Sequence, residues 1–357
     1  MIRRTLLVLL AAAALALHSC AVRPAPDAPG PITIMTFNVE NLFDTRDDPE
    51  KNDETFLPLA AKDTAHHRAG CHAIEVPRWR AQCLELDWSD AVLARKLARV
   101  AEAILANTPD GRGPDIVVLQ EVENRDVVEQ LRAMHLADAG YRPVVLIEGR
   151  DRRGIDVAFL SRLPLIGEPR LHEVTFENTT QAVRDDSRGL LEATFELPDG
   201  TSLTGFAVHF PAPFHPVDLR VQSYAALAQR LDALPAGRLA FAAGDFNTIS
   251  SEGWVLDRHV APDWDIAHRS GCDGCRGTYY YAPDDNWSFL DMVLFSPSLR
   301  SGPWQVATDR TTVANASSEQ VTAAGTPKRF DLASGRGVSD HWPLITTLVR
   351  SGAKRPN

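Results

Sequence analysis

Eight polar residues of this 357-residue chain lie at the ends of apolar segments, and their side chains could bind a cation or move a proton. Five end such a segment or directly follow it: Asn38, Glu121, His209, Asp245 and Asn247. Three stand at or near the start of one: Asp291, Asp340 and His341. Carboxylate and amide oxygens are ligands for Mg²⁺, and an imidazole titrates near neutral pH. Together these groups suit the hydrolysis of a phosphate ester.

Each residue type suggests a role in that reaction. Glu121 and Asp340 are expected to bind Mg²⁺, or Mn²⁺ in its place, with Asn38 completing the coordination or holding Glu121. His341 is the candidate general base, and Asp291 would accept a hydrogen bond from its other ring nitrogen. Taken alone, Asp340 and His341 would be ordinary turn residues. The functional interpretation therefore depends on the whole set.

The other three residues would act on the phosphate and the attacking water. His209 is expected to face the phosphoryl oxygens as a hydrogen-bond donor or an acid. Asp245 and Asn247 are expected to position the attacking water. Singly, His209 would be a half-buried histidine, and the other two would form a turn.

The apolar segments predict strands, and several are continuous enough to be covered on both faces. The predicted strands are 32–39, 115–122, 142–149, 155–161, 190–197, 202–210, 239–246, 289–296 and 342–349. Amphipathic segments predict helices at 89–107, 124–139 and 216–234. If the last two strands run antiparallel to the others, all eight polar residues gather at one edge of the sheets.

A set of ordered motifs adds a resemblance to this interpretation. The motifs are MTFNVENLF, VLQEVEN, RGIDVAFLSR, FAVHFPAP, AAGDFNT, FLDMVLFS and VSDHWPL, over about residues 32–348. In this order they resemble the endonuclease/exonuclease/phosphatase superfamily, which includes deoxyribonuclease I-like enzymes. The resemblance implies an α/β fold, a four-layered α-β-β-α sandwich of two mixed β-sheets flanked by helices. It also implies phosphoesterase activity that needs a divalent metal.

The resemblance also implies roles for single residues. It puts Asn38, Glu121 and Asp340 at the metal, and makes His341 the base, Asp291 its partner, and Asp245 and Asn247 the residues that orient the nucleophile. His209 matches the histidine of deoxyribonuclease-like members. Arg188 stands where relatives often carry an arginine that contacts phosphate, although a solvated surface arginine is the alternative. Asp156 resembles a motif of bacterial members, and its role is left open.

The N-terminal residues read as a targeting signal. Arg3 and Arg4 precede a short apolar run, so residues 1–19 are predicted to be a signal peptide. The sequence LHSC resembles a bacterial lipobox, which predicts lipidation of Cys20; simple secretion is the alternative. Residues 20–31 would be a Pro-rich tether, 32–350 the catalytic domain with an insertion at about 44–88, and 351–357 a tail. We expect a lipoprotein of the cell envelope, in the outer membrane or periplasm, held to a membrane by acyl chains alone.

Cysteine pairing follows from the same location. With Cys20 lipidated, four cysteines remain, an even number in an exported chain. This predicts the disulfides Cys71–Cys83 and Cys272–Cys275. Zinc at the second pair is the weaker alternative, because no other closely spaced pair exists. Histidines outside the motifs are expected at the surface: His66, His67, His72, His215 and His268. Residues 279–281, three tyrosines, are expected to pack over the second disulfide rather than stack on bases.

Charge and composition narrow the substrate only in part. The formal net charge of −10 disfavours nonspecific coating of polyanions, and no basic patch exists beyond Arg150, Arg152 and Arg153. The loops hold no apolar hairpin of the kind found in lipid-cleaving relatives. We predict an exported, monomeric, Mg²⁺-dependent nuclease that cleaves DNA, RNA or both. The alternatives are the same chemistry on a phospholipid head group, inositol phosphate or nucleotide, and a binding protein on an inactive scaffold. The complete set of polar residues argues against the last.

Overall fold

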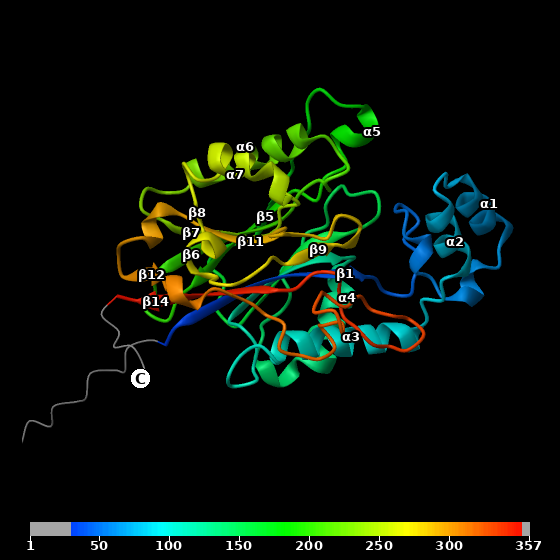
Figure 1. Cartoon of the computed structure of the whole chain (residues 1–357), viewed down its shortest axis with the longest axis horizontal. Helices are drawn as coiled ribbons and strands as arrows, with labels where there is room; N and C mark the ends of the chain where they lie inside the picture. Colours follow the sequence, from blue (N-terminus) through cyan, green and yellow to red (C-terminus); the bar gives the residue numbers. More distant parts are fainter. Residues whose placement is uncertain (1–29, 352–357) are drawn as a thin grey trace, which may run out of the picture.

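The computed structural model describes residues 30–351, in which two six-stranded mixed sheets pack face to face between layers of helices (Figure 1). The first sheet has the order β12-β14-β1-β2-β3, with β13 also beside β14: β1 (Ile32–Leu42), β2 (Ile116–Val122), β3 (Asp156–Ser161), β12 (Trp304–Val306), β13 (Thr312–Val313) and β14 (Leu344–Arg350). The second has the order β4-β5-β6-β7-β11-β8: β4 (Arg170–His172), β5 (Leu190–Glu196), β6 (Ser202–His209), β7 (Leu239–Asp245), β8 (Asp265–Ile266) and β11 (Asp291–Phe295). A hairpin contains β9 (Tyr279–Tyr281) and β10 (Asn286–Ser288). The predicted fold class is confirmed.

The longer helices cover the outer faces of the sheets. One apolar cluster joins the first sheet to α3 (Asp90–Leu105) and α4 (Arg125–His135), and another joins the second sheet to α6 (Val217–Asp232) and α7 (Gly253–His259). The other helices are α1 (Ala65–Ala73), α2 (Pro77–Glu85), α5 (Gln181–Arg184) and α8 (Ala267–Gly271), with short 3₁₀ turns between elements. Among residues 30–351, no helix combines the length and the apolar character that crossing a bilayer requires.

The predicted helices are present with slightly shorter bounds. The segments 89–107 and 216–234 form α3 and α6, and 124–139 forms α4 followed by a 3₁₀ turn at Ala137–Ala139. The start of α4 is capped, because the side chain of Asn124 accepts a hydrogen bond from the backbone N–H of Val127 at 2.9 Å.

Aromatic side chains fill the space between the two sheets. Phe159 of β3 meets Phe195 of β5 edge-on, with ring centroids 5.3 Å apart, and Phe241 of β7 at 6.3 Å. Gly205 in β6 makes room for this packing, since a Cβ atom there would lie 2.5 Å from the ring of Phe241. Close packing of these rings therefore holds the two sheets together.

The strand directions agree with the prediction for the last two long strands. β14 runs antiparallel to β1, and β11 runs antiparallel to β7, whereas β1 and β2, and β6 and β7, are parallel pairs. The start of β11 and the residues just before β14 therefore lie at the same edge as the ends of β1, β2, β6 and β7.

The strand predicted at 142–149 is not formed. Val145 makes a single bridge to Phe159, and the backbone groups of Val144 and Leu146 bond to side chains of α4. The guanidinium of Arg125 donates to the carbonyls of Val144 and Leu146, at 2.7 Å for the latter. The apolar run is buried, but side chains of a helix take the hydrogen bonds that a neighbouring strand would take.

Residues 44–88 form a small helical unit beside the sandwich, which we call the insertion lobe (Figure 1). It contains α1, α2 and two 3₁₀ turns, so this polar stretch has secondary structure of its own. Both predicted disulfides, Cys71–Cys83 in the lobe and Cys272–Cys275 before β9, are present. The predicted signal peptide, Cys20 and residues 352–357 of the predicted tail lie outside the described residues.

Candidate active site

Asn38 joins the two sheets at the edge where the predicted residues meet. It lies in β1, and its side-chain amide donates to Oδ2 of Asp245 in β7 at 3.0 Å. The same amide is 3.3 Å from Oε1 of Glu121 in β2. One buried amide thus fixes a carboxylate from each sheet, and the alternative that Asn38 holds Glu121 fits this geometry.

Glu121 owes its position to irregular backbone. It has a positive φ of 60°, and the β1–β2 register shifts between Asn38 and Leu42, where Glu40 and Asn41 also have positive φ values of 54° and 58°. The backbone N–H of Asn41 donates to Oε2 of Glu121 at 3.1 Å. Bulges re-aim side chains, and strained backbone is often found at functional sites. Here the irregularity turns an acidic side chain toward the edge shared by the two sheets.

His341 and Asp291 form a buried pair. Nδ1 of His341 lies 2.7 Å from Oδ2 of Asp291, which is the first residue of β11. Burial alone would lower the pKa of the imidazole, but the neighbouring carboxylates, Asp291 above all, hold that pKa well above 6.5. With Nδ1–H donating to Asp291, the lone pair of Nε2 is free for a proton.

His209 ends β6 opposite Asp245. Its Nε2 lies 3.6 Å from Oδ2 of Asp245, and its Nδ1 is buried without a partner among residues 30–351. Burial lowers the pKa of His209 well below 6.5, and the positive charges of Arg188, His341 and Arg153 act in the same direction. His209 is therefore neutral near pH 7, which makes it a hydrogen-bond donor and not a cationic acid.

Asp245 and Asn247 build the turn after β7. The backbone N–H of Asn247 donates to Oδ1 of Asp245 at 2.8 Å, with Asn247 at a positive φ of 52°. The side-chain amide of Asn247 donates to the carbonyl of Phe210 at 2.9 Å, which fastens the end of β6. Burial, together with the charge of Asp291, raises the pKa of Asp245 to about 7, against the opposing effect of His341.

Asp340 has partners that the sequence did not indicate. Its backbone N–H donates to Oε2 of Glu40 at 3.0 Å, and its carboxylate pairs with the guanidinium of Arg329. Arg329 also lies 3.2 Å from Oε1 of Glu40. Burial and the charge of Asp340 raise the pKa of Glu40 to about 8. Glu40 belongs to the motif NVEN and follows Asn38 by two residues, which was the available signal.

Lys96 adds a buried cation behind these carboxylates. It lies in α3, is 1% exposed, and donates from Nζ to the carbonyl of Val338 at 2.6 Å. Burial lowers its pKa to about 8, although Glu40, Asp340 and Glu121 oppose that shift. The sequence signal was a lysine on the apolar face of an amphipathic helix, between Leu93 and Leu97.

Arg188 is not the solvated surface arginine of the alternative. It bonds to Oδ2 of Asp151 at 2.6 Å, and its Nε has no partner within the described chain. With His209 and His215 it lines a pocket of about 480 Å³ of empty space, part of which is open to solvent. Arg188 therefore lies beside the site, although its charge is shared with Asp151.

Three of the five histidines expected at the surface are not exposed. His67 is buried in the lobe, His215 is half-buried beside the pocket, and the half-buried His268 stacks on Phe289 at 4.0 Å, whereas His66 and His72 are exposed. Asp156 is buried, and its Oδ1 accepts a hydrogen bond from the backbone N–H of Gly149 at 2.8 Å. Asp156 therefore anchors the end of the segment predicted as a strand.

The tyrosines do not pack over the disulfide as expected. Tyr279 pairs by its backbone with His341 and places its ring 4.9 Å from the imidazole. Tyr280 contacts Trp287 across the β9–β10 hairpin, at 5.2 Å. Tyr279 lies elsewhere than expected because its backbone pairs with that of His341, which brings its ring to the candidate base.

The side chains at this edge fit a divalent cation. Ligand atoms of Asp245, Asp291 and His341 lie within 4.8 Å of one another, and Oδ1 of Asp291 is buried with no partner in residues 30–351. The predicted ligands Glu121 and Asp340 lie beside this group: Glu121 shares the amide of Asn38 with Asp245, and Oδ1 of Asp340 is 3.9 Å from Nε2 of His341. Buried carboxylates without enough hydrogen bonds are stabilised by a hard cation.

Comparisons with known proteins agree with this architecture. The model of the Endonuclease/Exonuclease/phosphatase family matches residues 35–341, whereas no curated protein matches the chain. A humanized D. rerio TDP2 is 16% identical with a TM-score of 0.56, covering 89% of this chain and 99% of its own. The endonuclease/exonuclease/phosphatase from Beutenbergia cavernae DSM 12333 is 18% identical, with a TM-score of 0.56 and coverages of 91% and 73%. The Bacteroides thetaiotaomicron VPI-5482 mannosyl-6-phosphatase Bt3783 is 17% identical, with a TM-score of 0.53 and coverages of 89% and 99%. These structures share the fold, and the match to the family model shows that the chain belongs to the endonuclease/exonuclease/phosphatase family.

Proposed function

We propose that this chain is an exported, Mg²⁺-dependent phosphodiesterase, and specifically a nuclease that hydrolyses DNA, RNA or both. The family consists of phosphoesterases and nucleases, so hydrolysis of a phosphoester is the common chemistry. The observation that carries the proposal is the buried pair of His341 and Asp291, joined at 2.7 Å beside Asp245. A base held in one tautomer beside buried carboxylates is what activation of water at a phosphate requires.

The residues divide the work as follows. Nε2 of His341 removes a proton from the attacking water, while Asp291 holds Nδ1–H and stabilises the imidazolium that forms. Asp245 accepts a hydrogen bond from the same water and is itself held by Asn38. Glu121 and Asp340 would hold a Mg²⁺ ion, which would supply charge neutralisation for the phosphoryl oxygens.

Two further residues position the phosphate group. His209, neutral because of its burial, donates a hydrogen bond to a phosphoryl oxygen. Asn247 fixes the turn after β7 against the end of β6. These contacts hold the phosphorus in line with the attacking water.

Arg153 favours nucleic acid as the substrate. Its exposed guanidinium lies 2.5 Å from Oδ1 of Asn41, next to Glu121, where it can contact a neighbouring phosphate. A structural neighbour, D. rerio TDP2, was crystallised with a single-strand DNA product; it is 17% identical with a TM-score of 0.54.

A phosphorylated sugar is the second candidate substrate. The basic surface is small, since Arg150 pairs with Glu173 and Arg152 lies 3.8 Å from Asp186. The formal net charge of −10 also opposes binding of a long polyanion. The mannosyl-6-phosphatase among the structural neighbours makes a phosphomonoester the corresponding alternative.

A substrate panel separates the two. Purified protein is incubated with plasmid, single-stranded DNA, RNA and hexose 6-phosphates, each with Mg²⁺ or with excess EDTA. We expect cleavage of the nucleic acids with Mg²⁺ and none with EDTA or in Glu121→Ala. Release of phosphate from the sugars alone would replace the nuclease proposal, and full turnover in EDTA would remove the metal from it.

We further propose that the protein is a monomeric lipoprotein held to the cell envelope through Cys20. The proposal derives from the sequence LHSC after an apolar run. Cys20→Ser should move the protein from the membrane fraction to the soluble fraction, with its activity unchanged. Unaltered fractionation of Cys20→Ser with membranes contradicts the anchor.

A further inference from the structure

The insertion lobe has almost no apolar core of its own. Within residues 44–88 the buried apolar side chains are Leu57 and Trp88, together with Cys71 and Cys83. Units this small need a covalent or metal cross-link to stay folded. The disulfide between α1 and α2 supplies one, so the fate of the lobe after reduction depends on what surrounds its two sulfur atoms.

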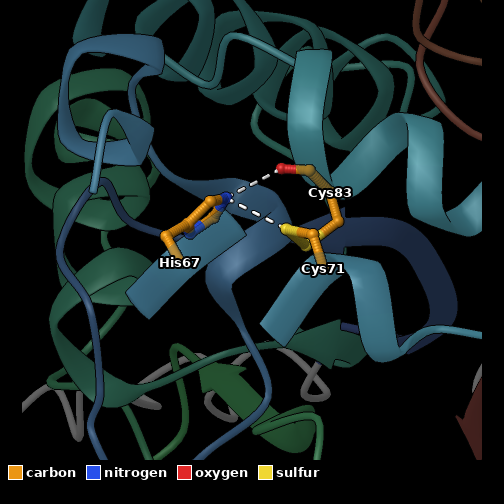
Figure 2. A group of neighbouring side chains, drawn as sticks. All are labelled: His67, Cys71 and Cys83. Atoms are coloured by element: carbon orange, nitrogen blue, oxygen red, sulfur yellow. Dashed lines mark hydrogen bonds between the residues drawn. A yellow bond between two sulfur atoms is a disulfide. The ribbon is translucent and has the colours of Figure 1, made fainter. Parts of the chain in front are cut away.

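A histidine lies against that disulfide. His67 and Cys71 are four residues apart on α1 and therefore share a face, and Cys83 reaches them from α2. Figure 2 shows Nε2 of His67 directed at both cysteines, 3.1 Å from Sγ of Cys71 and 3.0 Å from the carbonyl oxygen of Cys83. Ligand atoms of all three residues lie within 4.8 Å of one another, and all three residues are buried.

Lys62 makes the imidazole available for another role. Its ammonium donates to the carbonyl of Cys83 at 3.1 Å and to the carbonyl of Thr55 at 2.8 Å. The Cys83 carbonyl therefore keeps a donor if His67 withdraws. With its proton on Nδ1, His67 can offer the lone pair of Nε2 to a metal without leaving a buried carbonyl unpaired.

We propose that His67, Cys71 and Cys83 form a Zn²⁺ site when the disulfide is reduced, so that disulfide and zinc are alternative cross-links of the lobe. A dithiol gives two electrons and two protons to the disulfide and becomes a disulfide itself. Zn²⁺ then displaces the two thiol protons into solvent and binds two thiolates and the neutral imidazole, with water as the fourth ligand. Two sulfurs and one imidazole nitrogen are donors that zinc prefers over Mg²⁺.

The test uses the full chain with Cys20→Ser, Cys272→Ser and Cys275→Ser, which leaves only the two thiols of the lobe for a metal. The protein is reduced without oxygen in denaturant, refolded, checked for two free thiols, and titrated with Co²⁺ and then Zn²⁺. We expect one thiolate-to-cobalt charge-transfer band that Zn²⁺ abolishes, at a stoichiometry of one metal per chain. The oxidised protein, and the reduced protein with Cys71→Ser, should show no such band. The band reports sulfur ligands, so metal bound at the oxygen-rich candidate active site does not contribute.

The matched control is the neighbouring histidine. His67→Ala should weaken zinc binding at least about tenfold, because one of three protein ligands is lost, whereas the exposed His66→Ala should leave the affinity unchanged. Zinc should also protect the reduced lobe from proteolysis between residues 44 and 88. Equal zinc affinities for the two variants, or no charge-transfer band in the reduced protein, overturns the proposal.

Discussion

The two sides of the candidate active site are built differently. On one side, Asp245 and Asp291 end and begin regular strands of the second sheet, and His341 is bonded to Asp291 at 2.7 Å. On the other side, Glu40 and Glu121 sit on backbone with positive φ, and their partners include the cations Arg329 and Lys96. In the proposed mechanism the first side transfers the proton. On the second side, carboxylates and cations balance one another where the metal ion would bind.

This difference has a physical consequence for metal binding. A carboxylate pair without a counter-charge would attract any cation, but Glu40 and Asp340 already share Arg329. Lys96 adds a second positive charge, buried behind them. A metal ion bound there would compete with two side chains of the protein, so we expect its affinity to depend on residues that do not bind it.

The largest effect is expected from substitutions on the proton-transfer side of the site. His341→Ala should lower kcat by about 10²–10⁴-fold with the fold intact, because a positioned general base is lost. Asp291→Asn should lower it less, since the imidazole keeps its place but not its charged partner. Steady-state kinetics and circular dichroism of the two variants provide the measurement.

The pH profile sharpens the same prediction. In the proposed mechanism His341 acts as a base only when Nε2 is unprotonated, and its pKa is raised well above 6.5 by the neighbouring carboxylates. The rate should therefore fall as the pH falls through a pKa above 6.5. Loss of the partner charge in Asp291→Asn should move this limb to lower pH. If His341→Ala keeps the wild-type kcat and an unchanged acidic limb, Asp340 and His341 are turn residues after all.

The second effect concerns the buried cation on the metal side. Lys96→Met should lower the free energy of unfolding by about 1–3 kcal/mol, because it leaves the buried carbonyl of Val338 without its donor and removes one of the two cations near the carboxylates. Urea denaturation of the metal-free protein measures this loss. Lys328→Met is the control: Lys328 lies 3.1 Å from Glu319 but its side chain is 23% exposed, and Arg336 still pairs with Glu319, so the cost should stay below about 1 kcal/mol. Equal losses in the two variants would show that Lys96 does not support the carboxylates.

The two sides also differ in how far the sequence predicts them. Asp291 and His341 were predicted because both start apolar segments, and strand direction alone then brings them together. Glu121 was predicted as a residue at a strand end, but not the bulge that aims it. Arg329 lies in a loop without periodicity, about 290 residues from Glu40, so no local pattern relates them. The strand predicted at 142–149 is also missing for a reason that no local pattern shows, because Val144 and Leu146 bond to side chains of α4.

The smallest expected effect tests the competition between Arg329 and the metal. Arg329 is 65% exposed and pairs with both Asp340 and Glu40. An exposed pair of this kind contributes little, so Arg329→Gln should raise the affinity for Mg²⁺ or Mn²⁺ by only about two- to fivefold, through loss of the competing guanidinium. Calorimetric titration measures the change, with Arg336→Gln as the control, because Arg336 belongs to the same loop but pairs with Glu319. The gain should shrink at high salt, which screens an exposed guanidinium more than a buried ammonium. If Arg329→Gln binds the metal more weakly than the wild type, the guanidinium orders Asp340 for the ion instead of competing with it, and Lys96 alone would remain as the opposing charge.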